Sequence, residues 1–331
     1  MVTPPLKPSA LKRFKDTYKG DDRVLPSMKR HVMRAIADEE HTRRHDVMHP
    51  SEMSKKEWCG RHDYYRIIGT TSEKDSALAN PSFTMNNIFA EGHTIHSKYQ
   101  DWLWEMGVLH GHWTCLSCHE YWEDISPREC PVCHSPRLMY REVPLNRDGV
   151  GGHADGGVHE LEDWSGLIEV KSIGMGTLRM EAPRLHQRYL DGETLENIWW
   201  KIQRPFATHI KQGMLYLWMA WPRYDEICFI YESKFHQQVK EFVLVYNPQL
   251  ISPILEVARE VNKSVAAGTP PARPEWAETA DSKICKSCPY RRACWGLEEP
   301  DDTAQENDPT PIRVRRASPA KRRRVVRSAQ L

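Results

Sequence analysis

The pattern of apolar and polar positions predicts a mixed α/β fold, because strand-like and helix-like segments both recur along the chain. Short apolar runs typical of buried strands lie at 166–173, 226–232 and 240–246. Apolar residues at helical spacing lie at 89–104, 196–220 and 248–266. Pro205 stands inside the second of these helices, so we expect a break or a kink there.

Glu169 and Lys171 occupy alternate positions of the first strand, so their side chains point to the same face of the sheet. Asp155 precedes them in the glycine-rich segment 150–158, which we interpret as the bend of a hairpin that brings Asp155 beside Glu169. Two carboxylates and an ammonium group placed together can bind a divalent metal ion and position a water molecule. The pattern therefore indicates metal-assisted phosphodiester hydrolysis.

A second Glu-x-Lys occurs at Glu232 and Lys234. No glycine-flanked acid precedes this copy, and we interpret it as a solvated ion pair, which is the usual state of such a pair on a strand.

Two predicted helices each carry a pair of candidate site residues spaced four positions apart, so each pair shares one helix face. Gly92 and His96 form the first pair, and we expect Gly92 to admit a neighbouring backbone while His96 reaches the metal site. Gln212 and Tyr216 form the second pair and could hold a phosphate or the substrate strand. A structural histidine, and a surface amide beside a half-buried phenol, are the alternatives.

Charge is balanced overall, with 46 Lys+Arg and 45 Asp+Glu in 331 residues, but not along the chain. Residues 298–308 hold six acids, and residues 309–331 hold eight basic residues without an acid. We interpret 298–331 as a disordered acidic-then-basic tail. Its basic cluster, Lys321, Arg322, Arg323 and Arg324, suits nucleic-acid binding, a solubilising role or, less well, nuclear localisation.

No apolar run reaches the ~20 residues that span a bilayer, and the N-terminus lacks a signal-peptide core. We therefore expect a cytoplasmic protein without a membrane partner. In that reducing compartment the nine cysteines are expected to be metal ligands in preference to disulfides.

Four of the cysteines form two Cys-x2-Cys pairs separated by a short loop, which predicts a structural zinc ribbon. They are Cys115, Cys118, Cys130 and Cys133. His119 and His134 adjoin the pairs, but four thiolates already complete a tetrahedral site.

A second set, Cys285, Cys288 and Cys294, needs a fourth ligand. Cys228 lies in an apolar strand and is interpreted as a buried small hydrophobic residue, so Cys59 is the better candidate. Such a site would tie the two ends of a domain together. Spacing alone fits both zinc and an iron–sulfur cluster.

In their order along the chain, these motifs resemble the RecB-like branch of the PD-(D/E)XK nuclease superfamily, in particular the CRISPR-associated RecB-like iron–sulfur exonucleases and their phage relatives. The AddB-type nuclease domains are also similar. The resemblance covers roughly residues 59–294 and implies a restriction-endonuclease-like mixed β-sheet flanked by helices, with an iron–sulfur staple and, here, a zinc-ribbon insertion. It implies a [4Fe–4S] cluster on Cys59, Cys285, Cys288 and Cys294.

The resemblance also implies the roles of the site residues. His96, Asp155, Glu169 and the backbone carbonyl of Val170 would bind Mg²⁺ or Mn²⁺. Lys171 would position the attacking water, with Gln212 and Tyr216 in support. Ala154 stands where the superfamily name has a proline, and the ribbon is an insertion that the family does not require.

We therefore expect an N-terminal helical and basic segment (1–50), a nuclease domain (51–297) that contains the zinc ribbon (112–140), and the tail (298–331). The expected activity is exonucleolytic cleavage of single-stranded or frayed DNA ends in recombination, repair or end processing. The alternatives are a non-catalytic DNA-binding protein and a subunit that acts only with recombination or integration proteins. The chain lacks a phosphate-binding Walker motif, so any helicase motor would be a separate protein.

Overall fold

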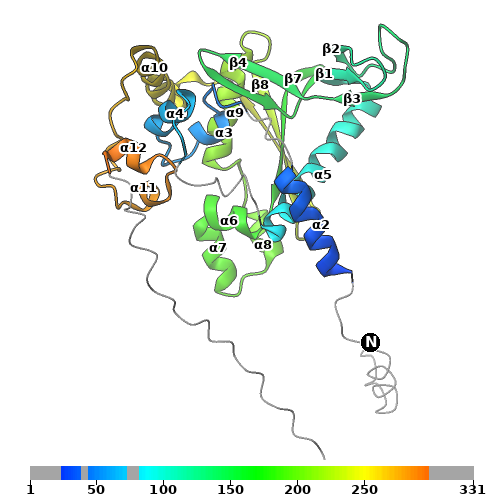
Figure 1. The fold of residues 1–331 in the computed structure, drawn as a ribbon. Coiled ribbons are helices and arrows are strands. Elements are labelled where there is room, and N and C mark those ends of the chain that lie inside the picture. The colour runs from blue at the N-terminus through cyan, green and yellow to red at the C-terminus, as the bar shows by residue number, and fades with distance from the viewer. Residues whose placement is uncertain (1–23, 39–43, 73–81, 298–331) are drawn as a thin grey trace, which may run out of the picture.

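The computed structural model describes residues 24–38, 44–72 and 82–297, and its centre is a seven-stranded mixed sheet (Figure 1). The strand order is β2-β1-β6-β7-β8-β9, with β3 also paired to β1. The strands are β1 (Leu109–Cys115), β2 (Tyr121–Ile125), β3 (Leu138–Tyr140), β6 (Gly156–Leu161), β7 (Trp164–Ile173), β8 (Glu226–Ser233) and β9 (Val239–Val245). The three strands predicted from apolar runs are thus confirmed as β7, β8 and β9.

β7 and β8 are parallel, whereas the other neighbouring strands are antiparallel. A parallel pair needs a long crossover. Here the crossover consists of four helices: α6 (Met175–Glu181), α7 (Pro183–Leu190), α8 (Leu195–Trp200) and α9 (Ala207–Ala220). The break expected near Pro205 is confirmed, because α8 ends at Trp200 and α9 begins at Ala207.

A separate two-stranded sheet pairs β4 (Val143–Arg147) with β5 (Val150–Ala154). The chain therefore passes from one sheet to the other at Asp155, between β5 and β6. The interpretation of 150–158 as a hairpin bend was wrong: β5 and β6 do not pair with each other, and the hairpin turn lies between Leu161 and Trp164. Asp155 still reaches Glu169, because β6 pairs with β7.

β7 is apolar on both faces because helices cover both of them. On one face, Leu167 and Ile173 belong to the main core with Leu215 and Leu217 of α9. On the other face, Val170 packs against α5 (Phe83–Glu105). The side chain of Ser82 caps α5 by accepting a hydrogen bond from the Met85 N–H, and the helix predicted at 89–104 is confirmed as part of α5.

The remaining helices lie around this core. They are α2 (Leu25–Asp38), α3 (Pro50–Met53), α4 (Gly60–Ile67), the 3₁₀ helix η1 (Pro248–Leu250), α10 (Ser252–Ala267), α11 (Lys283–Ser287) and α12 (Arg291–Trp295). The helix predicted at 248–266 is confirmed as η1 and α10. α4 lies beside α11 and α12, although about 220 residues separate them in the sequence (Figure 1). The predicted tail at 298–331, with Lys321 to Arg324, lies outside the described residues. Within the described part of the chain, no helix is both long and apolar enough to cross a bilayer.

The strands of the cysteine ribbon are continuous with the main sheet, since β1 pairs with β2, β3 and β6. The buried His110 of β1 fastens this end of the sheet to the loop after α9. Its two ring nitrogens contact Tyr224 Oη at 2.7 Å and Glu123 Oε1 at 2.9 Å, and Arg223 also bonds to both His110 and Glu123. The ribbon is therefore anchored to the core and is not an independent appendage.

Two helix glycines meet different surroundings. A Cβ atom on Gly213 of α9 would lie 2.6 Å from the ring of the buried Phe229, so α9 approaches β8 closely there. A Cβ atom on Gly92 of α5 would meet only Ser172 Oγ, at 3.8 Å. The expectation that Gly92 admits a neighbouring backbone was wrong; the close approach is at Gly213, and it is made by the side chains of Phe229 and Ile227.

We expect Gly213→Ala to lower the free energy of unfolding by about 1–3 kcal/mol, because overpacking outweighs the ~1 kcal/mol that alanine gains in a helix. Gly92→Ala is the matched control and should be neutral or stabilising by up to about 1 kcal/mol. Denaturant melts of both variants measure the difference. Equal stability of the two would contradict the close packing of α9 on β8.

Candidate active site

Glu169 and Lys171 on β7 form the centre of a buried polar site with Gln212 of α9. Lys171 Nζ donates to Glu169 Oε1 at 2.6 Å and to Gln212 Oε1 at 3.1 Å. Gln212 Nε2 donates to Glu169 Oε1 at 3.1 Å. Because Glu169 is only 2% exposed, these bonds replace the water that a carboxylate would otherwise bind.

Asp155 lies at the end of β6 and faces Glu169, as the sequence predicted. β6 and β7 pair Gly156 with Ile168, so the next pair in the same register is Asp155 with Glu169. Asp155 Oδ2 accepts a hydrogen bond of 2.7 Å from the Val170 N–H, in the middle of β7. Gln100 of α5 adds a 2.9 Å bond to the Asp155 carbonyl.

His96 of α5 reaches the same carboxylate, with 3.2 Å between His96 Nδ1 and Asp155 Oδ1. Burial alone would lower the pKa of His96, but the hydrogen bond to Asp155 and its charge outweigh burial and raise that pKa. His96 thus lies at Asp155, as predicted. The alternative of a structural histidine away from the site was wrong.

Gln212 and Tyr216 share one face of α9, and Gln212 Nε2 donates to Tyr216 Oη at 2.9 Å. Both residues are buried, at 8% and 5% exposure. The alternative of a surface amide beside a half-buried phenol was therefore wrong, and Gln212 links Tyr216 to Glu169.

Sequence reasoning missed Glu142, which lies between β3 and β4. The β4–β5 ladder ends at the pair Val143 and Ala154, and Glu142 and Asp155 are the residues that adjoin this pair. Burial and the charge of Asp155 raise the pKa of Glu142 to about 7, and the charge of His96 opposes them. No motif marks Glu142, since its position depends on a left-handed backbone (φ 63°) that the sequence does not display.

His209 of α9 was also missed. Its Nδ1 bonds to the hydroxyl of the buried Tyr231, and burial together with the charge of Lys171 lowers the pKa of His209 to about 3. The imidazole is therefore neutral and adds no positive charge beside Lys171.

The residues fit a divalent metal ion. Glu169 Oε2 is buried and has no hydrogen-bond partner within the described residues, whereas Oε1 accepts two hydrogen bonds. A buried oxygen in this state is costly unless a ligand binds it. Carboxylate oxygens of Asp155 and Glu169, the Val170 carbonyl and the His96 imidazole form a donor set suited to Mg²⁺ or Mn²⁺.

The second Glu-x-Lys is not a solvated ion pair, so that interpretation was wrong. Glu232 is 4% exposed and pairs with Lys98 of α5, while Lys234 pairs with Glu91 at 3.2 Å. β8 runs parallel to β7 in a register that pairs Ser172 with Glu232. The two Glu-x-Lys copies thus lie on neighbouring strands, one in the site and one bound to α5.

The first four-cysteine group can bind a metal ion. Sulfur atoms of Cys115, Cys118, Cys130 and Cys133 all lie within 4.8 Å of one another, as a single tetrahedral ion requires. The backbone N–H groups of Ser117 and Val132 each donate to one of the sulfurs at 3.4 Å, which suits thiolate ligands. His134 bonds instead to Glu129 at 3.1 Å.

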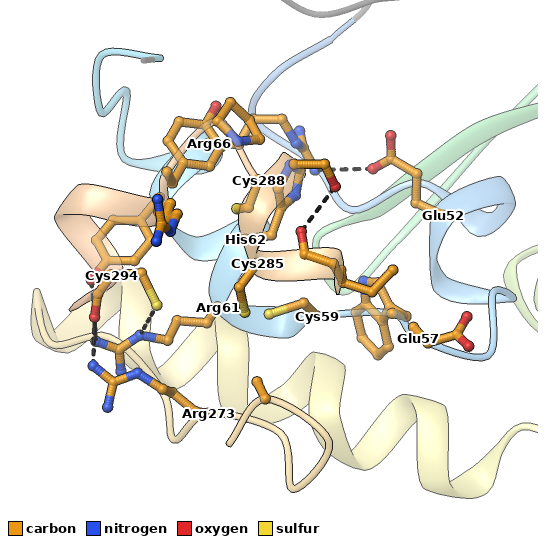
Figure 2. A pocket seen from close by; sticks show the side chains of 18 of the residues that line it. Glu52, Glu57, Cys59, Arg61, His62, Arg66, Arg273, Cys285, Cys288 and Cys294 are labelled. Atoms are coloured by element: carbon orange, nitrogen blue, oxygen red, sulfur yellow. Dashed lines mark hydrogen bonds and ion pairs between the residues drawn. The ribbon is translucent and has the colours of Figure 1, made fainter. Parts of the chain in front are cut away.

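The second four-cysteine group lines a cavity of about 940 Å³ between α4, α11 and α12. Figure 2 shows the sulfurs of Cys59 and Cys285 directed toward one another. Unlike the ribbon, no three of these sulfurs lie within 4.8 Å of one another. Cys228 stays apart in β8, where burial raises its pKa to about 12, as expected of a buried small residue.

Arg61 of α4 holds the two ends of this second group together (Figure 2). Its guanidinium donates to Cys294 Sγ at 3.1 Å, to the Cys294 carbonyl at 3.3 Å and to the Pro271 carbonyl at 2.7 Å. A further bond of 3.2 Å reaches Tyr65 Oη, which in turn donates to the Ala293 carbonyl. One cation thus orients a cysteine 233 positions away in the chain.

Comparison with known proteins found weak structural similarities. No protein-family model and no curated protein sequence matches the chain. Among solved structures, SSO0001 aligns at 11% identity over 84% of this chain and 100% of its own, with a TM-score of 0.37. The alkaline exonuclease LHK-Exo from Laribacter hongkongensis aligns at 13% identity over 68% of this chain and 90% of its own, with a TM-score of 0.36. Its complex with dAMP gives 14% identity and the same TM-score. At such scores the chemistry of the site rests on the contacts described above.

Burial and the nearby Asp155 raise the pKa of Glu169 to about 7, against an ordinary 4.5. Between these values the folded state keeps a proton that the unfolded state releases, so the stability of the metal-free protein falls as pH rises. Glu169→Gln removes the ionisable carboxyl and with it this contribution to the pH dependence of stability. The free energy of unfolding of wild type, relative to Glu169→Gln, should fall by up to about 3 kcal/mol from about pH 5 to about pH 8. Denaturant melts in a metal chelator measure it, and a difference that does not change with pH would contradict the raised pKa.

Proposed function

We propose that this protein is a Mg²⁺- or Mn²⁺-dependent deoxyribonuclease of the PD-(D/E)XK type. It hydrolyses phosphodiester bonds at single-stranded or frayed DNA ends, as an exonuclease in recombination, repair or end processing. The observation that carries the proposal is the convergence of Asp155, Glu169 and Lys171 in one buried site with an unpartnered Glu169 oxygen.

The contacts of Lys171 support its role in orienting the reacting groups. Its ammonium has three N–H donors, and two of them are used by Glu169 and Gln212. The third can donate to a water molecule or to a phosphate oxygen. Burial would lower the pKa of Lys171, but the charges of Glu169 and Asp155 raise it, so the group stays cationic and stabilises the negative charge of the transition state.

The remaining residues hold this geometry. Gln212, fixed by Tyr216, keeps Glu169 Oε1 and Lys171 in place, and Glu169 Oε2 is left without a hydrogen-bond partner within the described residues. His96, Asp155, Glu169 and the Val170 carbonyl would hold the metal ion, which when bound polarises the phosphate and lowers the pKa of a coordinated water.

The two cysteine groups are assigned structural roles. Cys115, Cys118, Cys130 and Cys133 would bind Zn²⁺ in the ribbon. Cys59, Cys285, Cys288 and Cys294 would hold a [4Fe–4S] cluster that clasps the two ends of a nuclease domain at 51–297. The segments 1–50 and 298–331 are assigned to accessory roles, with DNA as the partner of the basic end of the tail.

The proposed activity is tested with end-labelled linear single-stranded DNA and a closed single-stranded circle, in Mn²⁺, with anaerobically purified protein. Wild type should degrade the linear strand and leave the circle intact. Glu169→Gln should lower the rate about a hundredfold or more, because it removes an anionic oxygen from the proposed metal site.

Glu232→Gln is the matched control, since Glu232 is also a buried, lysine-paired glutamate on the neighbouring strand. It should lower stability and keep cleavage. Absence of cleavage by folded, cluster-containing wild type would overturn the proposed function, as would equal rates for the two variants. Cleavage of the circle would overturn the exonuclease assignment alone.

The cluster assignment is tested with Cys285→Ala against Cys228→Ala, which removes a buried cysteine outside the group. Cys285→Ala should lose iron and acid-labile sulfide and become less soluble, while Cys228→Ala should retain both. Elemental analysis of each anaerobically purified chain decides the matter. Iron retained by Cys285→Ala at normal stability would contradict the assignment. If wild type contains no iron and Cys285→Ala loses zinc, the group is a zinc site and not an iron–sulfur cluster.

A further inference from the structure

Tyr231 of β8 lies beside Lys171 of the site. The parallel register of β7 and β8 pairs these two residues, and paired residues of a sheet point to the same face. Tyr231 is fully buried. The imidazole of His209 from α9 meets the Tyr231 ring edge-on, with 5.4 Å between the ring centroids, and His209 Nδ1 bonds to the Tyr231 hydroxyl. His209 is thus attached to a buried neighbour of Lys171.

The Tyr231 hydroxyl determines which nitrogen of His209 carries the proton. Its oxygen accepts a hydrogen bond of 2.9 Å from the Phe206 N–H. Within the described residues, the other hydrogen-bond partner of this hydroxyl is His209 Nδ1. A phenol has one proton, and a buried proton without an acceptor is costly, so the hydroxyl donates to Nδ1. The neutral imidazole therefore carries its own proton on Nε2.

His209 presents this Nε2–H beside the site. His209 and Gln212 share one face of α9, because they are three positions apart. Gln212 contacts Glu169 and Lys171. His209 Nε2 has no hydrogen bond or ion pair within the described residues, and it is not among their buried atoms that lack a partner, so solvent reaches it. An open hydrogen-bond donor therefore lies near Lys171.

A neighbouring acid leaves this donor free. Glu181, at the end of α6, is close enough for its charge to act on both Lys171 and Tyr231. Its Oε2 accepts a hydrogen bond of 2.6 Å from Thr208 Oγ1, and Glu181 forms no ion pair with His209. The Nε2–H of His209 is therefore available to a ligand.

The charge state of His209 indicates which ligand fits. Burial and the charge of Lys171 keep the imidazole neutral, with a pKa of about 3. The Lys171 ammonium attracts negative charge, while a neutral imidazole adds a directed hydrogen bond without a second cation that Lys171 would repel. A group with acceptor oxygens and a negative charge suits this pair, and a phosphate of DNA has both properties.

We propose that His209, with its proton held on Nε2 by Tyr231, donates a hydrogen bond to a phosphate oxygen of the DNA strand that lies beside Lys171. His209 is then a substrate-binding residue, and Tyr231 is the residue that positions it. The inference rests on the proposed function and adds these two residues to the same site.

The tautomer is tested by nuclear magnetic resonance of the full chain with ¹⁵N-labelled histidine, without DNA. His209→Gln identifies the His209 signals by their absence. Because the pKa is about 3, wild type should show the Nε2–H tautomer unchanged from about pH 5 to about pH 8. Tyr231→Phe should give a mixture of both tautomers, since the hydroxyl that fixes Nδ1 as an acceptor is gone.

The contact with DNA is tested by fluorescence anisotropy of a labelled oligothymidine strand, without added divalent cation, so that no cleavage occurs. His209→Phe keeps an aromatic ring against Phe206 and Tyr231 but lacks the donor, and should weaken binding about tenfold. His209→Gln offers an N–H at similar reach and should bind within about threefold of wild type.

His236→Phe is the matched control. His236 is also half-buried, stacks on the Trp199 ring and contacts a hydroxyl, that of Ser233, but none of these contacts reaches the site. This variant should bind DNA as wild type does.

A proton on Nδ1 in wild type would overturn the proposal. Unchanged DNA binding by His209→Phe would also overturn it, as would an equal loss in His236→Phe or no recovery in His209→Gln. None of these readouts requires cleavage. A protein that binds DNA through His209 without cleaving it would therefore overturn the proposed nuclease activity alone.

Discussion

The hydrogen bond from the Val170 N–H to Asp155 Oδ2 is the interaction on which the site depends. Asp155 stands where the chain leaves one sheet and enters another, so the strand ladder alone does not fix its side chain. The bond, buried within the sheet, attaches the carboxylate to the middle of β7, one residue from Glu169 and one from Lys171. A charge-assisted bond in such surroundings is strong and directional. His96 of α5 then contacts a carboxylate that is held in this way.

Helices on both faces of β7 then complete the arrangement. α5 brings His96 to Asp155, and α9 brings Gln212 to Glu169 and Lys171. α9 can do so because Gly213, next to Gln212, lets the helix approach β8. The crossover that makes β7 and β8 parallel thus also delivers a polar side chain to the site. Two adjacent residues of α9 therefore serve different purposes: Gly213 allows close packing on β8, and Gln212 contacts the site.

The sequence predicted the parts of the site that follow local periodicity. Glu169 and Lys171 share a face because strand residues alternate, and Gln212 and Tyr216 meet because helix residues recur after four positions. Such local rules do not predict contacts between segments that are far apart in the sequence. Arg61 and Cys294 are 233 positions apart, and Glu142 owes its place to a left-handed residue between two sheets. Likewise, Glu232 was expected in solvent because no local pattern announces Lys98 on a helix that precedes it by 134 residues.

The contact between α4 and α12 has a consequence for the architecture of larger proteins. Arg61 contacts residue 294, and Arg44 and Trp295 line the same cavity, so the folded unit from residue 44 to residue 297 begins and ends at neighbouring points. A unit with adjacent ends can be inserted into a loop of another protein, or joined to partners on one side, without separating its own strands. The same geometry would tolerate circular permutation, with new ends placed in an exposed turn. The cysteine-lined clasp thus gives the unit the properties of a transferable module.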